Sequence, residues 1–301
     1  MKQNMLKIGI DLGGTKIEGI VLDAHNNIIE RKRIPTEQEF GYDHVMKNVI
    51  GLYHDLLGEN KQQLHRVGIG TPGYSNKEGL LKNSSLLCLN NKPFLNDFER
   101  FLGVRPNIEN DANCFAIAEA VMGSGKGKKL VFGVIMGTGC GGGVVIDGSV
   151  IRGAQYLGGE VGHVTLHPNG VDCFCGKKGC AERYISGSGV QERYLDKTGA
   201  AKDVKNIIAA YRGGDADAGE IMNDFFEDFG IVMANLINLL DPDKIVLGGG
   251  LSNIDELYTI GIERVKKHVF KAAPIVNIVE NLLGDSAGVF GAALLGENEK
   301  V

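Results

Sequence analysis

Four residues near the middle of the chain have the types and the spacing of a metal site. Cys173, Cys175 and Cys180 place three thiols within eight residues, and His163 lies ten residues before the first of them. Three thiolates and one imidazole complete the tetrahedral coordination of Zn²⁺, and such a closed site is structural. The alternative is three buried cysteines, although packing alone does not require cysteine at this spacing. Because four protein ligands leave no open position, a zinc hydrolase is disfavoured.

A second chemical pattern is the glycine-rich run Asp11-x-Gly13-Gly14-Thr15-Lys16. An aspartate at a strand end can hold hydrated Mg²⁺, and the backbone N–H groups of such a turn can bind phosphate oxygens. The simpler alternative is a hairpin turn with an exposed aspartate and lysine. Further glycine clusters at 137–143 and 248–250 favour the interpretation as a nucleotide-phosphate site.

Other nucleotide-binding patterns fail on their context. Gly-x-Gly-x-x-Gly occurs at 68–73 and at 137–142, but Pro72 interrupts the first and neither is expected to open a helix. Both matches therefore argue poorly for a nicotinamide dehydrogenase. The sequence also contains no Gly-x4-Gly-Lys-[Ser/Thr] loop, which disfavours a Walker-type NTPase.

The composition limits the class of partner. The chain has 301 residues, 44 of them glycine and only 7 proline, and a formal net charge of −5, so it lacks the basic surface expected for a nucleic acid or an anionic membrane. The uncharged stretch 130–146 holds six glycines, which suits two buried strands better than a membrane helix. Six cysteines without a signal peptide indicate a reducing compartment, and we expect a cytoplasmic protein.

The elements that must position these residues form a repeated pattern. Apolar runs at 7–16, 67–73, 131–139 and 245–250 end in glycine-rich turns, as buried strands of an α/β sheet do. Helical periodicity or end signals predict helices at 42–57, 112–122, 218–240 and 286–295. A strand, a glycine turn and a hairpin fit both 7–34 and 131–152, which predicts two similar lobes.

Five motifs in this order resemble the ROK family of bacterial sugar kinases and related repressors. They are Asp11-x-Gly-Gly-Thr-Lys16, Glu109-Asn-Asp-Ala-Asn113, Gly137-Thr-Gly-Cys-Gly-Gly-Gly143, Gly159-Glu-Val-Gly-His163, and the cysteine motif that ends at Glu182. The resemblance covers residues 7 to about 295. It implies an α/β, two-lobed actin-like ATPase fold (ribonuclease H-like) with an interlobe cleft. We expect a small lobe of residues 1–118 and 286–301, and a large lobe of residues 119–285 that carries the zinc knuckle.

Phosphoryl transfer to a hydroxyl needs a carboxylate that takes the proton. Asp111 is the candidate, although Asp and Asn at a helix start are also ordinary caps, and a helix N-terminus would lower the pKa of Asp111. The resemblance assigns the base to Asp111. The substrate-binding residues it implies are Gly73, Asn83, Asn110, Asp111, Glu160, His163 and Glu182. The nucleotide-binding residues it implies are Asp11, Gly13, Gly14, Thr15, Lys16, Gly137, Thr138, Gly139 and Gly249.

The implied activity is ATP-dependent phosphorylation of a hexose at its 6-hydroxyl, with Mg²⁺ and structural Zn²⁺. A homodimer is compatible with the resemblance. Fructokinase and N-acetylglucosamine kinase are the first candidates, and glucokinase or mannokinase is the alternative. A ROK regulator needs an N-terminal DNA-binding helix-turn-helix, and only ten residues precede Asp11. Since the nucleotide loops and the cysteines lie on different segments, we expect metal loss to weaken sugar affinity and to leave ATP affinity nearly unchanged.

Overall fold

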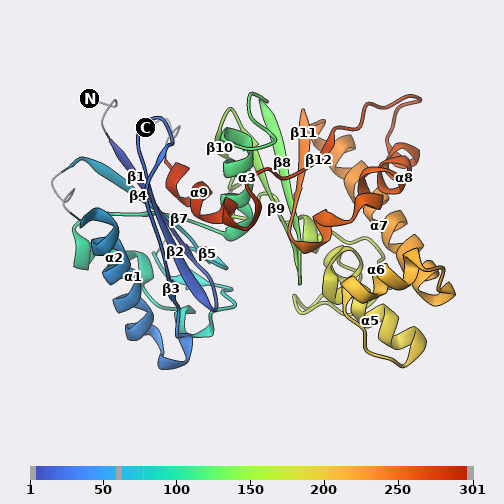
Figure 1. Ribbon diagram of the computed structural model, residues 1–301, viewed down its shortest axis with the longest axis horizontal. Helices are drawn as coiled ribbons and strands as arrows, with labels where there is room; N and C mark the ends of the chain where they lie inside the picture. The colour runs from blue at the N-terminus through green and yellow to red at the C-terminus, as the bar shows by residue number, and fades with distance from the viewer. Residues whose placement is uncertain (1–4, 59–62, 77, 297–301) are drawn as a thin grey trace. The chain divides into compact units, whose positions relative to one another are not determined.

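The computed structural model describes residues 5–58, 63–76 and 78–296 (Figure 1). The described chain folds into two compact units. The first unit comprises the described residues from 5 to 122, Gly148–Val150, and residues 285–296. The second unit comprises Gly123–Asp147 and Ile151–Gly284.

The first unit is built on a five-stranded mixed sheet in the order β3-β2-β1-β4-β7. Its strands are β1 (Leu6–Leu12), β2 (Lys16–Leu22), β3 (Ile28–Pro35), β4 (His65–Gly70) and β7 (Asn107–Glu109). The first three are antiparallel, whereas β1, β4 and β7 are parallel. A separate hairpin consists of β5 (Tyr74–Ser75) and β6 (Leu81–Lys82). The carboxyl ends of the three parallel strands therefore bring Asp11, Thr71 and Asn110 to one edge.

Helices cover both faces of this sheet (Figure 1). They are α1 (Tyr42–Leu57), α2 (Phe94–Leu102), α3 (Asp111–Val121) and α9 (Ala287–Leu294). The predicted apolar stripe of α1 is buried, and Leu52 and Leu56 fill the space beside Gly19. On the other face α9 lies so close that a Cβ on Gly9 would be 2.3 Å from the Val289 carbonyl oxygen. Glycine on β1 thus permits the close contact of α9 with the sheet.

The second unit repeats this arrangement with a sheet in the order β10-β9-β8-β11-β12. Its strands are β8 (Leu130–Met136), β9 (Cys140–Ile146), β11 (Lys244–Gly248) and β12 (Ile278–Glu280), and the short edge strand β10 (Ser149–Val150) consists of residues that are grouped with the first unit. β8 and β9 are antiparallel, and β8, β11 and β12 are parallel. Asp147 and Gly148 both have positive φ at the predicted turn, as expected for an Asp-Gly hairpin. The predicted repeat of strand, glycine turn and hairpin is therefore confirmed.

The helices of the second unit are α4 (Glu182–Ile185), α5 (Gly187–Thr198), α6 (Val204–Arg212), α7 (Ala216–Leu240) and α8 (Ile260–His268). The long helix α7 buries Phe225, Phe226 and Phe229 completely and packs beside α8, so its acidic–aromatic stretch belongs to the core. Residues 151–181 lack α-helix and contain only a 3-10 turn and isolated bridges. Within the described ranges, no helix combines the length and the apolar character that a membrane span requires.

Candidate active site and metal centre

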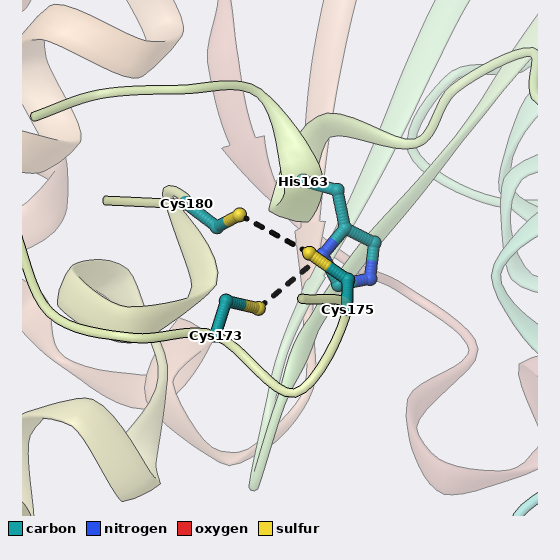
Figure 2. A group of neighbouring side chains, drawn as sticks. All are labelled: His163, Cys173, Cys175 and Cys180. Carbon is teal, nitrogen blue, oxygen red and sulfur yellow. Dashed lines mark hydrogen bonds between the residues drawn. The ribbon is translucent and has the colours of Figure 1, made fainter. Parts of the chain in front are cut away.

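The four predicted metal ligands converge in the second unit (Figure 2). One donor atom from each of His163, Cys173, Cys175 and Cys180 lies within 4.8 Å of the other three. Nδ1 of His163 is 3.8 Å from Sγ of Cys173, and Sγ of Cys175 is 3.6 Å from Sγ of Cys180. Tetrahedral Zn²⁺ bonds of about 2.0–2.3 Å place ligand atoms about 3.5–3.8 Å apart. The donor set and its spacing therefore fit zinc, and no cysteine of the chain forms a disulfide.

Tight turns build the loop that carries the cysteines. The Cys173 amide donates to the Lys177 carbonyl at 2.8 Å, and Gly176, with a φ of 84°, allows the chain to reverse between them. A Cβ on Gly179 would be 1.6 Å from the His167 carbonyl oxygen, so glycine is required there. Gly176 and Gly179 therefore allow the tight backbone turns that bring the thiols together.

The buried carboxylate of Asp228 anchors this loop to helix α7. Nε2 of His167 is 2.7 Å from Oδ1 of Asp228, and Nη1 of Arg193 donates to Oδ2 of Asp228 at 3.2 Å. Burial raises the pKa of Asp228, although the bonds from His167 and Arg193 act in the opposite direction. The His167 ring also contacts the Tyr184 ring edge-on, with centroids 4.5 Å apart. Sequence reasoning missed this anchor, because the residues in contact are 17 to 61 positions apart in the chain.

The glycine loop 137–139 lies against the start of α5 in the second unit. Its carbonyl oxygens at Gly137 and Thr138 accept hydrogen bonds from the amides of Gly187 and Ser188, at 2.7 and 3.2 Å. In a trans peptide the next N–H group points the opposite way, which directs the amides of Thr138 and Gly139 away from α5. Gly249 also lies against the loop, since its Cβ would be 3.0 Å from the Gly137 nitrogen.

Glu182 contacts this loop directly. Its Oε2 accepts a hydrogen bond from the Cys140 amide at 2.9 Å and occupies the space where a Cβ on Gly139 would lie, at 2.6 Å. Burial, with a further contribution from the Glu182 charge, raises the pKa of the Cys140 thiol, which is therefore neutral. Glu160 and His163 belong to one 3-10 turn, in which the His163 amide donates to the Glu160 carbonyl at 3.2 Å.

The first unit holds the other glycine turn by similar means. The carbonyl oxygens of Gly13 and Gly14 accept hydrogen bonds from the Thr36 hydroxyl at 2.6 Å and the Gln38 amide at 3.0 Å. The Thr36 amide donates to the Thr15 carbonyl at 3.1 Å. The N–H groups of Gly14 and Thr15 therefore point to the opposite side, as a phosphate-binding turn requires.

Asp11 lies at the start of this turn in a partly buried position. Burial, together with the charges of Asp111 and Glu18, raises its pKa from an ordinary 3.8 to about 6. Glu18 is opposite Asp11 on β2 and is buried, where it accepts hydrogen bonds from Arg31 and Arg33. A carboxylate whose ionised form is destabilised by burial and by neighbouring negative charges is typical of a site that binds a cation.

Asp111 is the first residue of α3, and Asn110 is its cap. Oδ1 of Asn110 accepts the hydrogen bond of the Asn113 amide at 2.7 Å, which leaves the side-chain NH2 of Asn110 as a donor. The buried Glu109 accepts from the Asn110 amide and from Asn113 Nδ2, at 3.2 and 3.1 Å. Capping and ligand binding are thus compatible in this motif.

The expected direction of the Asp111 pKa shift is wrong. Solvent reaches the side chain, but the surrounding protein leaves the carboxylate less hydrated than in water, which raises its pKa. The hydrogen bond from the Ala112 amide at 2.9 Å lowers it by less. The desolvation therefore exceeds the effect of the helix N-terminus, and Asp111 is a stronger base than the sequence suggests.

Gly73 and Asn83 are brought together in the first unit. A Cβ on Gly73 would be 2.3 Å from the Lys82 carbonyl oxygen and 2.8 Å from the Ser84 nitrogen, so Gly73 lies against the backbone around Asn83. The Thr71 amide donates to the Glu109 carbonyl at 3.0 Å. This bond joins the loop after β4 to the segment that leads into Asp111.

Known proteins are similar to this chain in sequence and in fold. The model of the ROK family matches residues 7–299. An N-acetyl-D-glucosamine kinase of Pectobacterium atrosepticum is 39% identical over 298 residues, with 95% of this chain and 97% of that protein covered. The crystal structure of a ROK hexokinase from Thermus thermophilus has a TM-score of 0.89 at 30% identity, with 96% and 97% covered. A ROK family glucokinase from Streptomyces griseus, in complex with glucose and AMPPNP, has a TM-score of 0.74 at 28% identity, with 97% and 99% covered.

The two repeated α/β units are those of the actin-like fold, and the prediction of this fold is confirmed. The chain belongs to the ROK family. Within that family it is a sugar kinase.

Proposed function

We propose that the chain transfers the terminal phosphoryl group of ATP to the 6-hydroxyl of a hexose, with N-acetylglucosamine as the first candidate. The choice of sugar is supported by the 39% identity to an N-acetyl-D-glucosamine kinase over nearly the whole chain. Fructose, glucose and mannose are the alternatives. A cytoplasmic location is part of the proposal, since no disulfide joins any of the six cysteines, all of which lie in the described ranges.

The proposal that residues of the first unit take part in phosphoryl transfer depends on one observation. The carboxyl ends of parallel strands β1 and β7 place Asp11 and Asp111 near enough for the charge of Asp111 to raise the pKa of Asp11. One carboxylate adjoins a turn with outward N–H groups, and the other begins a helix with a free amide donor beside it. Phosphoryl transfer needs these two functions, a phosphate and cation site and a base for the hydroxyl.

Asp111 is the proposed base. Its carboxylate accepts the proton of the 6-hydroxyl as the bond to phosphorus forms, and the Asn110 amide donates to a neighbouring hydroxyl. The raised pKa of Asp111 makes it a better proton acceptor than an ordinary capping aspartate. Because it is solvent accessible, a sugar can reach it without rearrangement of α3.

Each glycine turn is proposed as a binding surface for nucleotide phosphates, through the N–H groups around Gly14 in the first unit and around Gly139 in the second. When bound, Mg²⁺ neutralises charge on the phosphates. Asp11, Thr15 and Lys16 are the residues of the first unit proposed to hold it and the phosphate oxygens. Gly137, Thr138 and Gly249 form the corresponding surface of the second unit.

Glu160, His163 and Glu182 are the proposed sugar ligands of the second unit. Nδ1 of His163 faces Cys173, so its Nε2 is left for a sugar hydroxyl. Oε1 of Glu182 is likewise left, because the Cys140 amide uses Oε2. Structural zinc at His163 and the three cysteines would fix the orientation of these side chains.

A comparison of sugars tests this proposal. We would measure kcat/KM by coupled ADP release with N-acetylglucosamine, glucose, mannose and fructose, using protein of known zinc content. We expect the highest value for N-acetylglucosamine. A higher value for another hexose would correct only the substrate, whereas no sugar-dependent ADP release with any of them would contradict the proposed function.

A further inference from the structure

The backbone of Cys140, at the end of the second glycine loop, has contacts on both of its flanking peptide groups. Its N–H donates to Oε2 of Glu182 at 2.9 Å, and Glu182 lies two residues after the metal ligand Cys180. Its carbonyl oxygen lies against Gly162, where a Cβ would be only 2.0 Å away, and Gly162 directly precedes the metal ligand His163. Both segments that contact the Cys140 backbone, around Gly162 and around Glu182, therefore carry a proposed metal ligand.

A further contact connects the same segment to the start of the loop. Residues 180–187 run from Cys180 through α4 to the first residue of α5. There the Gly187 amide donates to the Gly137 carbonyl at 2.7 Å, and the Ser186 hydroxyl caps α5 by accepting from the Gly189 amide at 3.1 Å. One short segment thus contacts both ends of the 137–140 loop, at Gly137 and at Cys140.

We propose that Glu182 is a positioning residue for the nucleotide-binding loop, and that the metal centre orders this loop as well as the sugar ligands. The proposal rests on the proposed function for the assignment of the loop to ATP phosphates. The proposal explains why residue 139 is a glycine, because Oε2 of Glu182 occupies the position that a Cβ would take. It also reverses the expectation that ATP affinity is independent of the metal, since these contacts join the two sites.

Two variants of Glu182 isolate the hydrogen bond to Cys140. Glu182→Ala and Glu182→Gln remove the same negative charge, but only the Gln side chain keeps an oxygen that can accept from the Cys140 amide. The readout is the Kd of the non-hydrolysable analogue AMPPNP with Mg²⁺, measured by calorimetry without sugar. We expect Glu182→Ala to bind about tenfold more weakly than Glu182→Gln, as loss of a hydrogen bond to a buried peptide implies.

Asp172→Ala is the matched control. Asp172 is an acid of the same loop, but its side chain is 82% exposed and pairs only with the exposed Lys178, at 3.3 Å. We expect its AMPPNP affinity to equal that of the wild type. Zinc content and thermal unfolding of each variant, measured in the same preparations, show whether the metal centre and the fold persist.

The outcomes separate this proposal from the proposed function. Equal AMPPNP Kd values for Glu182→Ala and Glu182→Gln would overturn the positioning role even if both lose sugar affinity. Gly162→Ala perturbs the next peptide group, through the Cys140 carbonyl, and an unchanged AMPPNP Kd in this variant would also overturn the proposal. Wild-type protein that binds sugar but fails to bind AMPPNP would contradict the assignment of the loop to ATP, and with it the proposed function.

Discussion

The two glycine turns present their N–H groups in the same way but are held differently. In the first unit, the carbonyl oxygens of residues 13–15 bond to Thr36 and Gln38, which follow the adjacent strand β3. In the second unit, the loop 137–140 bonds to Glu182 and to the start of α5, about 40 to 50 residues further along the chain. The first turn is therefore supported locally by its own hairpin. The second depends on a distant segment that begins at the proposed metal ligand Cys180.

Because the two turns are held differently, we expect the two units to have different roles. The first unit keeps two carboxylates, Asp11 and Asp111, at a desolvation cost that raises the pKa of each. The second unit brings together His163 and three cysteines, whose donor atoms suit zinc. Substitutions in the first unit should therefore affect the chemical step, and substitutions around the metal should affect binding and stability.

The largest expected effect is on the chemical step of the first unit. Asp111→Asn keeps the shape of the side chain but cannot accept the proton, so we expect kcat to fall about a thousandfold while the sugar Kd changes little. Asp196→Asn, on the exposed surface of α5, is the control and should keep wild-type kcat. A kcat for Asp111→Asn above about a tenth of the wild-type value would remove Asp111 from the role of base.

Loss of the metal should be the next largest effect. Cys175→Ser removes one of four ligands, and we expect zinc to fall from about one per chain to near zero by elemental analysis. Sugar affinity should weaken about tenfold, and the Tm should fall without complete unfolding, since both units have their own apolar cores. Cys88→Ser, in the first unit, is the control. Full sugar affinity in zinc-free protein would refute the structural role of the metal.

A matched pair of glycine substitutions compares the two turns directly. A Cβ on Gly139 would be 2.6 Å from Glu182 Oε2, whereas the nearest atom to a Cβ on Gly14 is Gln38 Nε2, at 3.6 Å. We expect Gly139→Ala to raise the KM for ATP about tenfold or more, because small displacements of a phosphate site are costly. Gly14→Ala should raise it less than about threefold. Equal effects would mean that both turns are supported alike.

The smallest expected effect is on stability. The pKa of Asp11 is about 6 in the folded protein and 3.8 as an ordinary value, so ionisation of Asp11 disfavours the folded state above pH 6. The pKa shift corresponds to about 3 kcal/mol, and solvent screening of this partly exposed carboxylate reduces it. Asp11→Asn should therefore raise the free energy of unfolding by about 1 kcal/mol at pH 8, and this gain should disappear as the pH falls from 6 towards 4.

Asp23→Asn is the comparison for this effect. The hydrogen bonds from Asn27 hold the pKa of the exposed Asp23 below its usual range, so its ionised form favours folding. Chemical denaturation at pH 4, 6 and 8 should show no gain for this variant. A gain of equal size in both variants at pH 8 would contradict the account of Asp11.

The sequence predicted the parts of the site that depend on local pattern. The strands before Asp11 and Gly137, the stripe of α1 and the spacing of the three cysteines follow from residue types alone. The contacts between distant segments could not be predicted this way. In the sequence Cys140 resembles an ordinary core residue, and only the fold brings its backbone between Gly162 and Glu182. The pKa of Asp111 was also missed, because desolvation depends on tertiary structure.

The central claim, that this ROK family chain phosphorylates the 6-hydroxyl of a hexose, is tested most directly by the product. Zinc-loaded protein would be incubated with ATP, Mg²⁺ and N-acetylglucosamine, and the product analysed by phosphorus–proton correlation NMR. The account predicts stoichiometric ADP and a phosphorus signal coupled to the two protons on carbon 6. A phosphorus coupled to the proton on carbon 1, or inorganic phosphate as the sole phosphorus product, would contradict it.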